Sequence, residues 1–223
     1  MGLTGDFPGF PPEAMPFLRD LKAHNERDWF NGHRDVYETA IRAPAEVFVA
    51  TMRPWLEDLA GHPLTAKVFR LHRDVRFSKD KSPYNAHLHI GFSDAAGGGR
   101  GFYAGLETER FVLGAGMFEA SGATLDAFRA AIDDPREGEA LAAIVTDLAK
   151  AGLRLDGAEL KRTPAPYAAD HPRADLLRRK GLTAWRETTN AGLISSPALM
   201  EFCEETFSAL LPLHTWLREA TAA

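Results

Sequence analysis

The stretch KVFRLHRDVRFSKDKSPYNAHLHIGF, residues 67–92, decides the fold expected for this chain. Hydrophobic and polar residues alternate over residues 68–77 and again over residues 87–92, which is the spacing of β-strands with one buried face. Residues 78–86 lie between them and contain the proline and asparagine typical of a loop. We therefore predict two neighbouring antiparallel strands joined by this loop.

The flanking segments extend this prediction in both directions. Strand spacing returns at residues 101–106 and 111–117, so we predict a central, mainly antiparallel sheet covering about residues 67–117. Helical spacing is found in residues 12–24, 25–61, 121–132, 135–150, 171–180, 202–211 and 213–219, and short strands are predicted at 160–163 and 182–187. This order predicts an α+β fold in one domain, residues 1–223, with helices from the N- and C-terminal parts packed against the sheet.

The composition is that of an ordinary globular protein, because 45% of the 223 residues are hydrophobic and 26% are charged. The N-terminal residues lack the basic and apolar regions of a secretory signal, and no apolar run approaches the ~18 residues that cross a bilayer. We therefore expect a cytoplasmic protein without membrane contact. The single Cys203 excludes an intramolecular disulfide and any site built from several cysteines.

Positive charge is concentrated in two segments of an otherwise acidic chain. The net charge is -5, yet residues 67–81 contain six Lys or Arg and two Asp, a local charge of +4 that leaves -9 elsewhere. Residues 159–181 carry six Lys or Arg against three acidic residues, a local charge of +3. An acidic protein disfavours nucleic-acid binding over its whole surface, whereas two basic segments favour a focused site for a small anion.

The polar face of the predicted strand pair carries the first candidate site. The alternation places every second residue from Arg70 to Arg76 on this face, and matching of the apolar faces brings His87 and His89 to it. In this register Arg76 lies near His87, and Asp74 lies near His89.

Arg73 departs from the alternation, because it lies on the apolar side of the first predicted strand. A buried guanidinium costs several kcal/mol unless it is paired, and Glu107 and Glu119 are the partners that the sequence suggests. An internal salt bridge and a role in ligand binding both explain an arginine at this position.

The spacing Arg70-x-x-Arg73-Asp74-x-Arg76-Phe77-x-x-Asp80-Lys81-x-x-Tyr84 resembles the signature of an uncharacterised bacterial family, domain of unknown function 2461. The resemblance continues in Asn25-x-x-x-Trp29-Phe30, Leu160-Lys161-Arg162, His171-Pro172, Leu176-Leu177-Arg178 and Lys180-Gly181, and therefore spans nearly the whole chain. It implies a single domain of about this length with a shared site, but no particular reaction. His87 and His89 lie outside that motif.

The main functional hypothesis is recognition of a phosphate- or carboxylate-bearing small molecule, since arginine and lysine bind such groups by paired hydrogen bonds and charge. The candidate ligand contacts are Arg70, Arg73, Arg76, Lys79, Lys81, Tyr84, Lys161, Arg162 and Arg178. Arg76 and Lys81 are the expected main contacts. Asp74 orients neighbouring side chains or, with His72, acts in catalysis if the protein is an enzyme. No glycine-rich phosphate loop is present, and the sequence identifies no cofactor.

Two alternatives come from other chemistry. A metal-dependent enzyme would use His72, Asp74, His87 and His89, although the neighbouring arginines repel a divalent cation unless an anionic substrate lies between them. A nucleic-acid or protein binding module would use the basic residues together with Tyr84, because the alternation assigns Phe69 and Phe77 to the core. Salt-dependent binding of an oligonucleotide would distinguish this last alternative.

Overall fold

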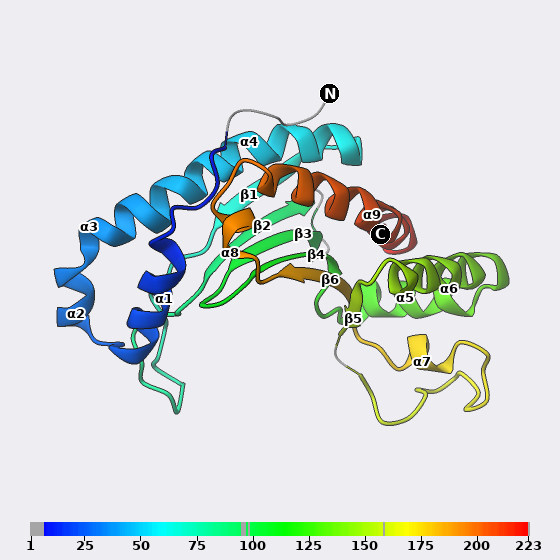
Figure 1. Ribbon diagram of the computed structural model, residues 1–223. Coiled ribbons are helices and arrows are strands. Elements are labelled where there is room, and N and C mark those ends of the chain that lie inside the picture. The colour runs from blue at the N-terminus through cyan, green and yellow to red at the C-terminus, as the bar shows by residue number, and fades with distance from the viewer. Residues whose placement is uncertain (1–6, 95–96, 98, 158, 223) are drawn as a thin grey trace.

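The computed structural model describes residues 7–94, 97, 99–157 and 159–222 (Figure 1). At its centre is a six-stranded sheet in the order β1-β2-β3-β4-β6-β5, in which every neighbouring pair is antiparallel. The strands are β1 (Leu64–Val68), β2 (Leu88–Asp94), β3 (Arg100–Leu106), β4 (Phe111–Met117), β5 (Arg154–Asp156) and β6 (Leu182–Thr188). The α+β prediction is confirmed.

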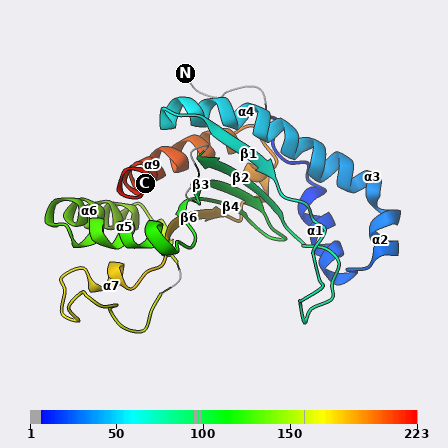
Figure 2. The ribbon, with the colours of Figure 1, turned by 180° about the vertical axis from the view of Figure 1, so that it is seen from behind.

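Helices from both ends of the chain cover one face of this sheet. The helices that the structure describes are α1 (Ala14–Ala23), α2 (Arg27–Gly32), α3 (Arg34–Val36), the π-helical turn η1 (Tyr37–Arg42), α4 (Ala43–Ala60), α5 (Gly122–Asp133), α6 (Pro135–Lys150), α7 (Ala174–Leu177), α8 (Ala191–Ile194) and α9 (Leu199–Ala220). Helix α4 packs on β1 and β2, and α9 packs on β3 and β4. The elements form an arch whose inner side is the second face of the sheet, between α1 and α5–α7 (Figures 1 and 2).

Helix α4 shows how the sequence produces this packing. Ala45, Phe48, Met52 and Leu56 recur every three to four residues and are all buried, so they form one apolar stripe against the sheet. The helix ends where Gly61 adopts a left-handed conformation with φ of 71°, as its position in the sequence predicts.

The two faces of the sheet differ sharply in character. Along β2, every second residue from Leu88 to Phe92 is buried toward the helices. The register pairs Gly91 with Lys67 of β1 and with Tyr103 of β3, so these residues lie on the opposite side, which we call the open face.

Glycines occupy alternate positions of the central strands on the open face. They are Gly91 of β2, Gly101 and Gly105 of β3, and Gly114 and Gly116 of β4. Because glycine has no side chain, neighbouring rings can lie directly against the backbone here. At Gly114, for example, a Cβ atom would come within 2.4 Å of the Trp185 ring.

The predicted strand at residues 68–77 is wrong for most of its length. Strand β1 ends at Val68, and the sheet pairing extends only to the Phe69 N–H, which donates to the His89 carbonyl. The chain then folds back on itself, so that His72 and Tyr84 form an isolated antiparallel bridge. The alternating residues therefore have a local partner instead of a long neighbouring strand. On their apolar side Leu71 is buried in the core, whereas Phe69 and Phe77 are exposed.

Other boundaries also differ from the prediction. The sheet extends to residues 64–188, because β5 and β6 join it, and the strand predicted at 182–187 is confirmed. No strand forms at 160–163 in the described chain, and the predicted helix at 171–180 is reduced to α7. The two predicted C-terminal helices are one helix, α9, because its buried stripe continues on both sides of Pro212. No helix among the described residues is long and apolar enough to span a membrane.

Candidate functional site

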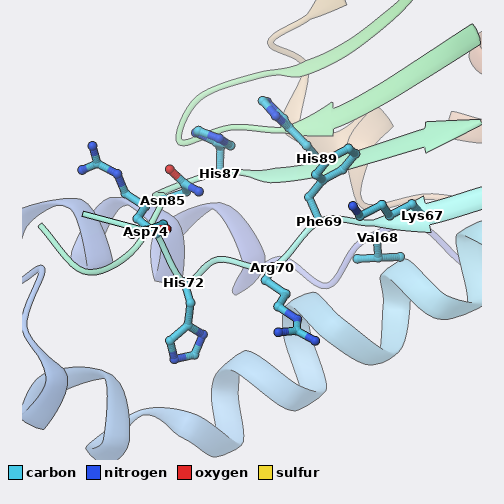
Figure 3. A pocket seen from close by; sticks show the side chains of 10 residues that line it. Lys67, Val68, Phe69, Arg70, His72, Asp74, Asn85, His87 and His89 are labelled. Carbon is cyan, nitrogen blue, oxygen red and sulfur yellow. The ribbon is translucent and has the colours of Figure 1, made fainter. Parts of the chain in front are cut away.

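A cleft runs along the open face of the sheet and consists of three adjoining cavities. The first has a volume of about 760 Å³ and lies beside the end of β1 (Figure 3). The second, of about 170 Å³, shares Phe69 and His89 with the first. The third, of about 390 Å³, shares Val112, Phe118 and Trp185 with the second. We refer to these three cavities together as the sheet cleft.

The first cavity is positively charged. Lys67, Arg70 and Arg73 line it together with Asp74, an excess of two positive charges when the histidines are neutral. Lys67 extends from the open face of β1, with its Nζ atom 4.8 Å from the centroid of the Phe69 ring. It forms no ion pair with any residue that the structure describes, so its charge is not neutralised locally.

His87 and His89 line this cavity together with Lys67. Their rings are stacked, with centroids 4.0 Å apart and an angle of 27° between the planes. Burial lowers the pKa of His87, although the charge of Glu107 offsets part of this effect. Burial, followed by the charge of His87, lowers the pKa of His89. Both rings are therefore mainly neutral at neutral pH, and each can donate one hydrogen bond.

Arg73 lies at the rim of the cavity and is held there by the loop between β1 and β2. Its Nη1 donates to a carboxylate oxygen of Asp80 and, at 3.2 Å, to the Ser82 carbonyl. Hydrogen bonds from Ser82, and then from Arg73, hold the pKa of Asp80 far below its usual range. The predicted partners are wrong, because Glu107 pairs with Arg110 and Glu119 lies near Lys180. Arg73 follows β1 instead of belonging to a strand, which keeps it out of the core.

Asp74 and Arg76 neutralise one another on the exposed loop. The Arg76 Nε donates to Asp74 Oδ1 at 2.9 Å, and its Nη2 donates to Oδ2 at 2.6 Å. These bonds lower the pKa of Asp74, which makes it a weak general base. The predicted register, which pairs Arg76 with His87 and Asp74 with His89, is wrong, because Phe69 lies beside His89. Asp74 nevertheless lines the first cavity with both histidines.

Arg70 and His72 point away from the histidine pair. Figure 3 shows both side chains on the opposite side of the chain from His87 and His89. The His72 ring contacts the edges of Phe30 and Tyr84, with centroid distances of 5.7 Å and 4.8 Å. The sequence analysis predicts one cluster that contains Arg70, His72 and the two histidines of the pair. In the structure, Arg70 and His72 lie on one side of the chain and the histidine pair lies on the other.

Tyr84 is part of the hydrophobic core. The prediction that its ring is free to stack on a ligand is wrong, because Tyr84 is only 4% exposed and stacks on Phe30 with centroids 4.2 Å apart. The Asn25 side chain donates to the Tyr84 carbonyl and accepts from its N–H. The Asn25 and Phe30 motif of the N-terminal helices thus anchors the basic loop.

The remaining predicted cations lie outside the sheet cleft. Lys79 and Lys81 are exposed on the loop, where Lys81 Nζ donates to the Val75 carbonyl at 3.0 Å. Lys161, Arg162 and Arg178 belong to the chain around α7, on the far side of the arch (Figure 1). Arg178 pairs there with Glu159 and Asp175. The two basic segments are therefore not brought together at one site.

The structure does not assemble the predicted metal ligands. All four line the first cavity, but His72 points to the opposite side of the chain from the stacked pair of His87 and His89, and Asp74 pairs with Arg76. Across the described residues, no group of three or more His, Cys, Asp or Glu is arranged to hold a metal ion.

The aromatic centre of the cleft was missed by the sequence analysis. Tyr103, Phe118 and Trp185 lie on the open face and enclose the second cavity. The signal that could have found them is the alternation of glycines in GFYAGL and GAGM, because such strands cannot bury side chains on both faces. Aromatic residues paired with glycines therefore mark a face that no helix covers.

Comparison with known sequences places the chain within a family but provides no activity. No curated protein matches the chain. The model of the family described as conserved hypothetical protein, DUF2461, matches residues 13–216 and so includes every element from α1 to nearly the end of α9. The chain, with its cleft on the open face of an antiparallel sheet, therefore belongs to the DUF2461 family.

Proposed function

We propose that the protein binds a small molecule bearing a phosphate or carboxylate group in the first cavity of the sheet cleft. Lys67, His87 and His89 are the main contacts, and Arg73 contributes at the rim. The observation that carries the proposal is the unneutralised charge of Lys67 in a cavity that has an excess of positive charge and is also lined by two hydrogen-bonding rings. An anionic ligand neutralises this positive charge, whereas a neutral ligand leaves it uncompensated.

The geometry also changes the contacts expected from the sequence. Arg76 is already neutralised by Asp74, and Lys81 is bound to the loop backbone outside the cavity. Of the ionisable groups in the cleft, the two stacked rings are best suited to proton transfer near neutral pH, in place of Asp74 and His72.

Replacing Lys67 with methionine is expected to weaken anion binding about tenfold or more, because a charged hydrogen bond contributes ~1.5–3 kcal/mol. Isothermal titration of the purified protein with inorganic phosphate and with citrate at low ionic strength measures the change. Lys79→Met is the matched control, since it removes the same charge from the same basic segment outside the cavity.

The two variants separate a site from a general charge effect. Loss of affinity in Lys67→Met with wild-type affinity in Lys79→Met supports the proposal. Equal losses in both variants would indicate that only the overall charge of the segment matters. The absence of phosphate and citrate binding to the wild type would refute the proposal.

A further inference from the structure

We propose that the ligand of the sheet cleft is a nucleoside phosphate, whose flat base stacks on the aromatic centre while its phosphate lies at Lys67. This rests on the proposed function, because the anion site fixes one end of the ligand. The new element is the chemical class of the end of the ligand that lies away from the phosphate. It is inferred from residues that are not among the proposed anion contacts.

Four aromatic side chains line the second cavity, and we call them the platform: Phe69, Tyr103, Phe118 and Trp185. The ring centroids of Tyr103 and Phe118 are 4.5 Å apart, and Trp185 lies 5.8 Å from Phe118 and 6.1 Å from Tyr103. Phe69 and Phe118 are nevertheless 45% and 49% exposed. Large apolar rings exposed around a cavity are typical of a surface that a ligand covers.

The Trp185 ring of the platform offers a flat face because glycine supports it, whereas the planes of Phe118 and Tyr103 are inclined to it by 46° and 32°. A Cβ at residue 114 would lie 2.4 Å from Cε3 of Trp185 and 2.8 Å from its Cδ2 and Cζ3, so the indole lies across the Gly114 backbone. Trp185 also lines the second and third cavities, so its other side is available to a ligand. Phe69 lies over Gly91 in the same way, with its Cε2 3.3 Å from the corresponding position. Planar heteroaromatic rings stack on surfaces of this kind.

Polar groups border the platform on its far side, as recognition of a heteroaromatic base requires. The Trp185 Nε1 donates to Thr183 Oγ1 at 2.8 Å, which fixes the ring and leaves the hydroxyl proton of Thr183 for another acceptor. Arg154 and Asp156 line the third cavity beside it and form an exposed ion pair. A hydrocarbon ring would leave these groups without a partner in the ligand.

The platform and the anion site meet at Phe69 and His89, which line both cavities. Lys67 also contacts the Phe69 ring, so one small molecule can reach the ammonium group and the platform together. A base joined to a phosphate through a sugar has this order of parts, with a polar spacer between the stacked ring and the charge.

Calorimetric titration with adenosine monophosphate, ribose 5-phosphate, adenosine and inorganic phosphate tests the assignment. The nucleotide is expected to bind more tightly than ribose 5-phosphate by a factor of about ten or more, which is the gain in affinity that base stacking provides.

Trp185→Leu is expected to reduce nucleotide affinity to that of ribose 5-phosphate and to leave ribose 5-phosphate binding unchanged. Gly114→Ala should have the same effect with the indole retained, because the added Cβ displaces it. Phe77→Leu, an exposed position away from the cleft, is the control.

The outcomes separate this inference from the proposed function. Binding of inorganic phosphate with no preference for the nucleotide over ribose 5-phosphate would refute the nucleotide and leave the anion site intact. Adenosine binding without phosphate binding would refute the anion site and leave the platform. Binding of single-stranded oligonucleotides without binding of the mononucleotide would overturn the small-molecule assignment.

Discussion

Replacing Tyr84 with alanine is expected to lower the free energy of unfolding by about 3–5 kcal/mol, the cost of removing a buried aromatic ring. The ring stacks on Phe30 and lies in a T-shaped contact with His72, so its loss leaves a cavity between the basic loop and the N-terminal helices. Urea unfolding followed by circular dichroism measures the change.

The matched control is Phe77→Ala on the same loop. Phe77 is 96% exposed, so the free energy of unfolding is expected to change by no more than about 0.5 kcal/mol. A Tyr84→Ala variant of unchanged stability that no longer binds phosphate would contradict the structural role and make Tyr84 a ligand contact.

Acidification is expected to remove about 3 kcal/mol of stability through His214 alone. This ring is buried against Phe102 and faces His62, Asp94, Arg100 and Arg218, and burial lowers its pKa to about 4. The unfolded chain binds a proton near pH 6.5, while the folded chain does not until about pH 4. The contribution of the neutral His214 ring to the free energy of unfolding is therefore complete above pH 6.5 and is lost as the pH falls toward 4.

His214→Gln isolates this contribution from those of the carboxylates. The free energy of unfolding of the wild type is expected to fall more steeply between pH 6.5 and 4 than that of the variant, whatever stability the variant has at neutral pH. Parallel pH profiles would contradict the lowered pKa, because the substitution would then remove no titration that differs between the folded and unfolded states.

The segments predicted correctly are those in which the spacing of hydrophobic residues along the sequence matches the side that is buried in the structure. The strands around Leu88–Phe92 and Leu182–Glu187 and the helix at Pro135–Lys150 all formed where the pattern indicated. The end of α4 at Gly61 also follows from one residue, because only glycine adopts that backbone conformation easily.

The failures arise where a segment depends on its neighbours in space. Residues 69–77 alternate like a strand, but alternation does not say which segment pairs with them, and here the chain pairs with itself at His72 and Tyr84. The resulting error in register placed His89 beside Asp74 instead of beside Phe69.

The candidate site was predicted only in its general charge. The basic stretch that begins at Lys67 does border the cleft, but charge alone did not distinguish Lys67 from cations that pair with the loop's own carboxylates, such as Arg73 and Arg76. The platform around Trp185 was missed altogether. Sequence periodicity shows that a strand has two faces, but it does not show which face the helices leave open.

The position of the anion site is tested most directly by an NMR titration of the histidine ring protons, with and without saturating inorganic phosphate. His87→Gln and His89→Gln assign the two signals. Phosphate is expected to raise the pKa values of His87 and His89, because a bound anion stabilises the protonated rings, and to leave that of the distant, buried His214 unchanged. Unchanged pKa values for both His87 and His89 at saturating phosphate would contradict an anion site in the sheet cleft.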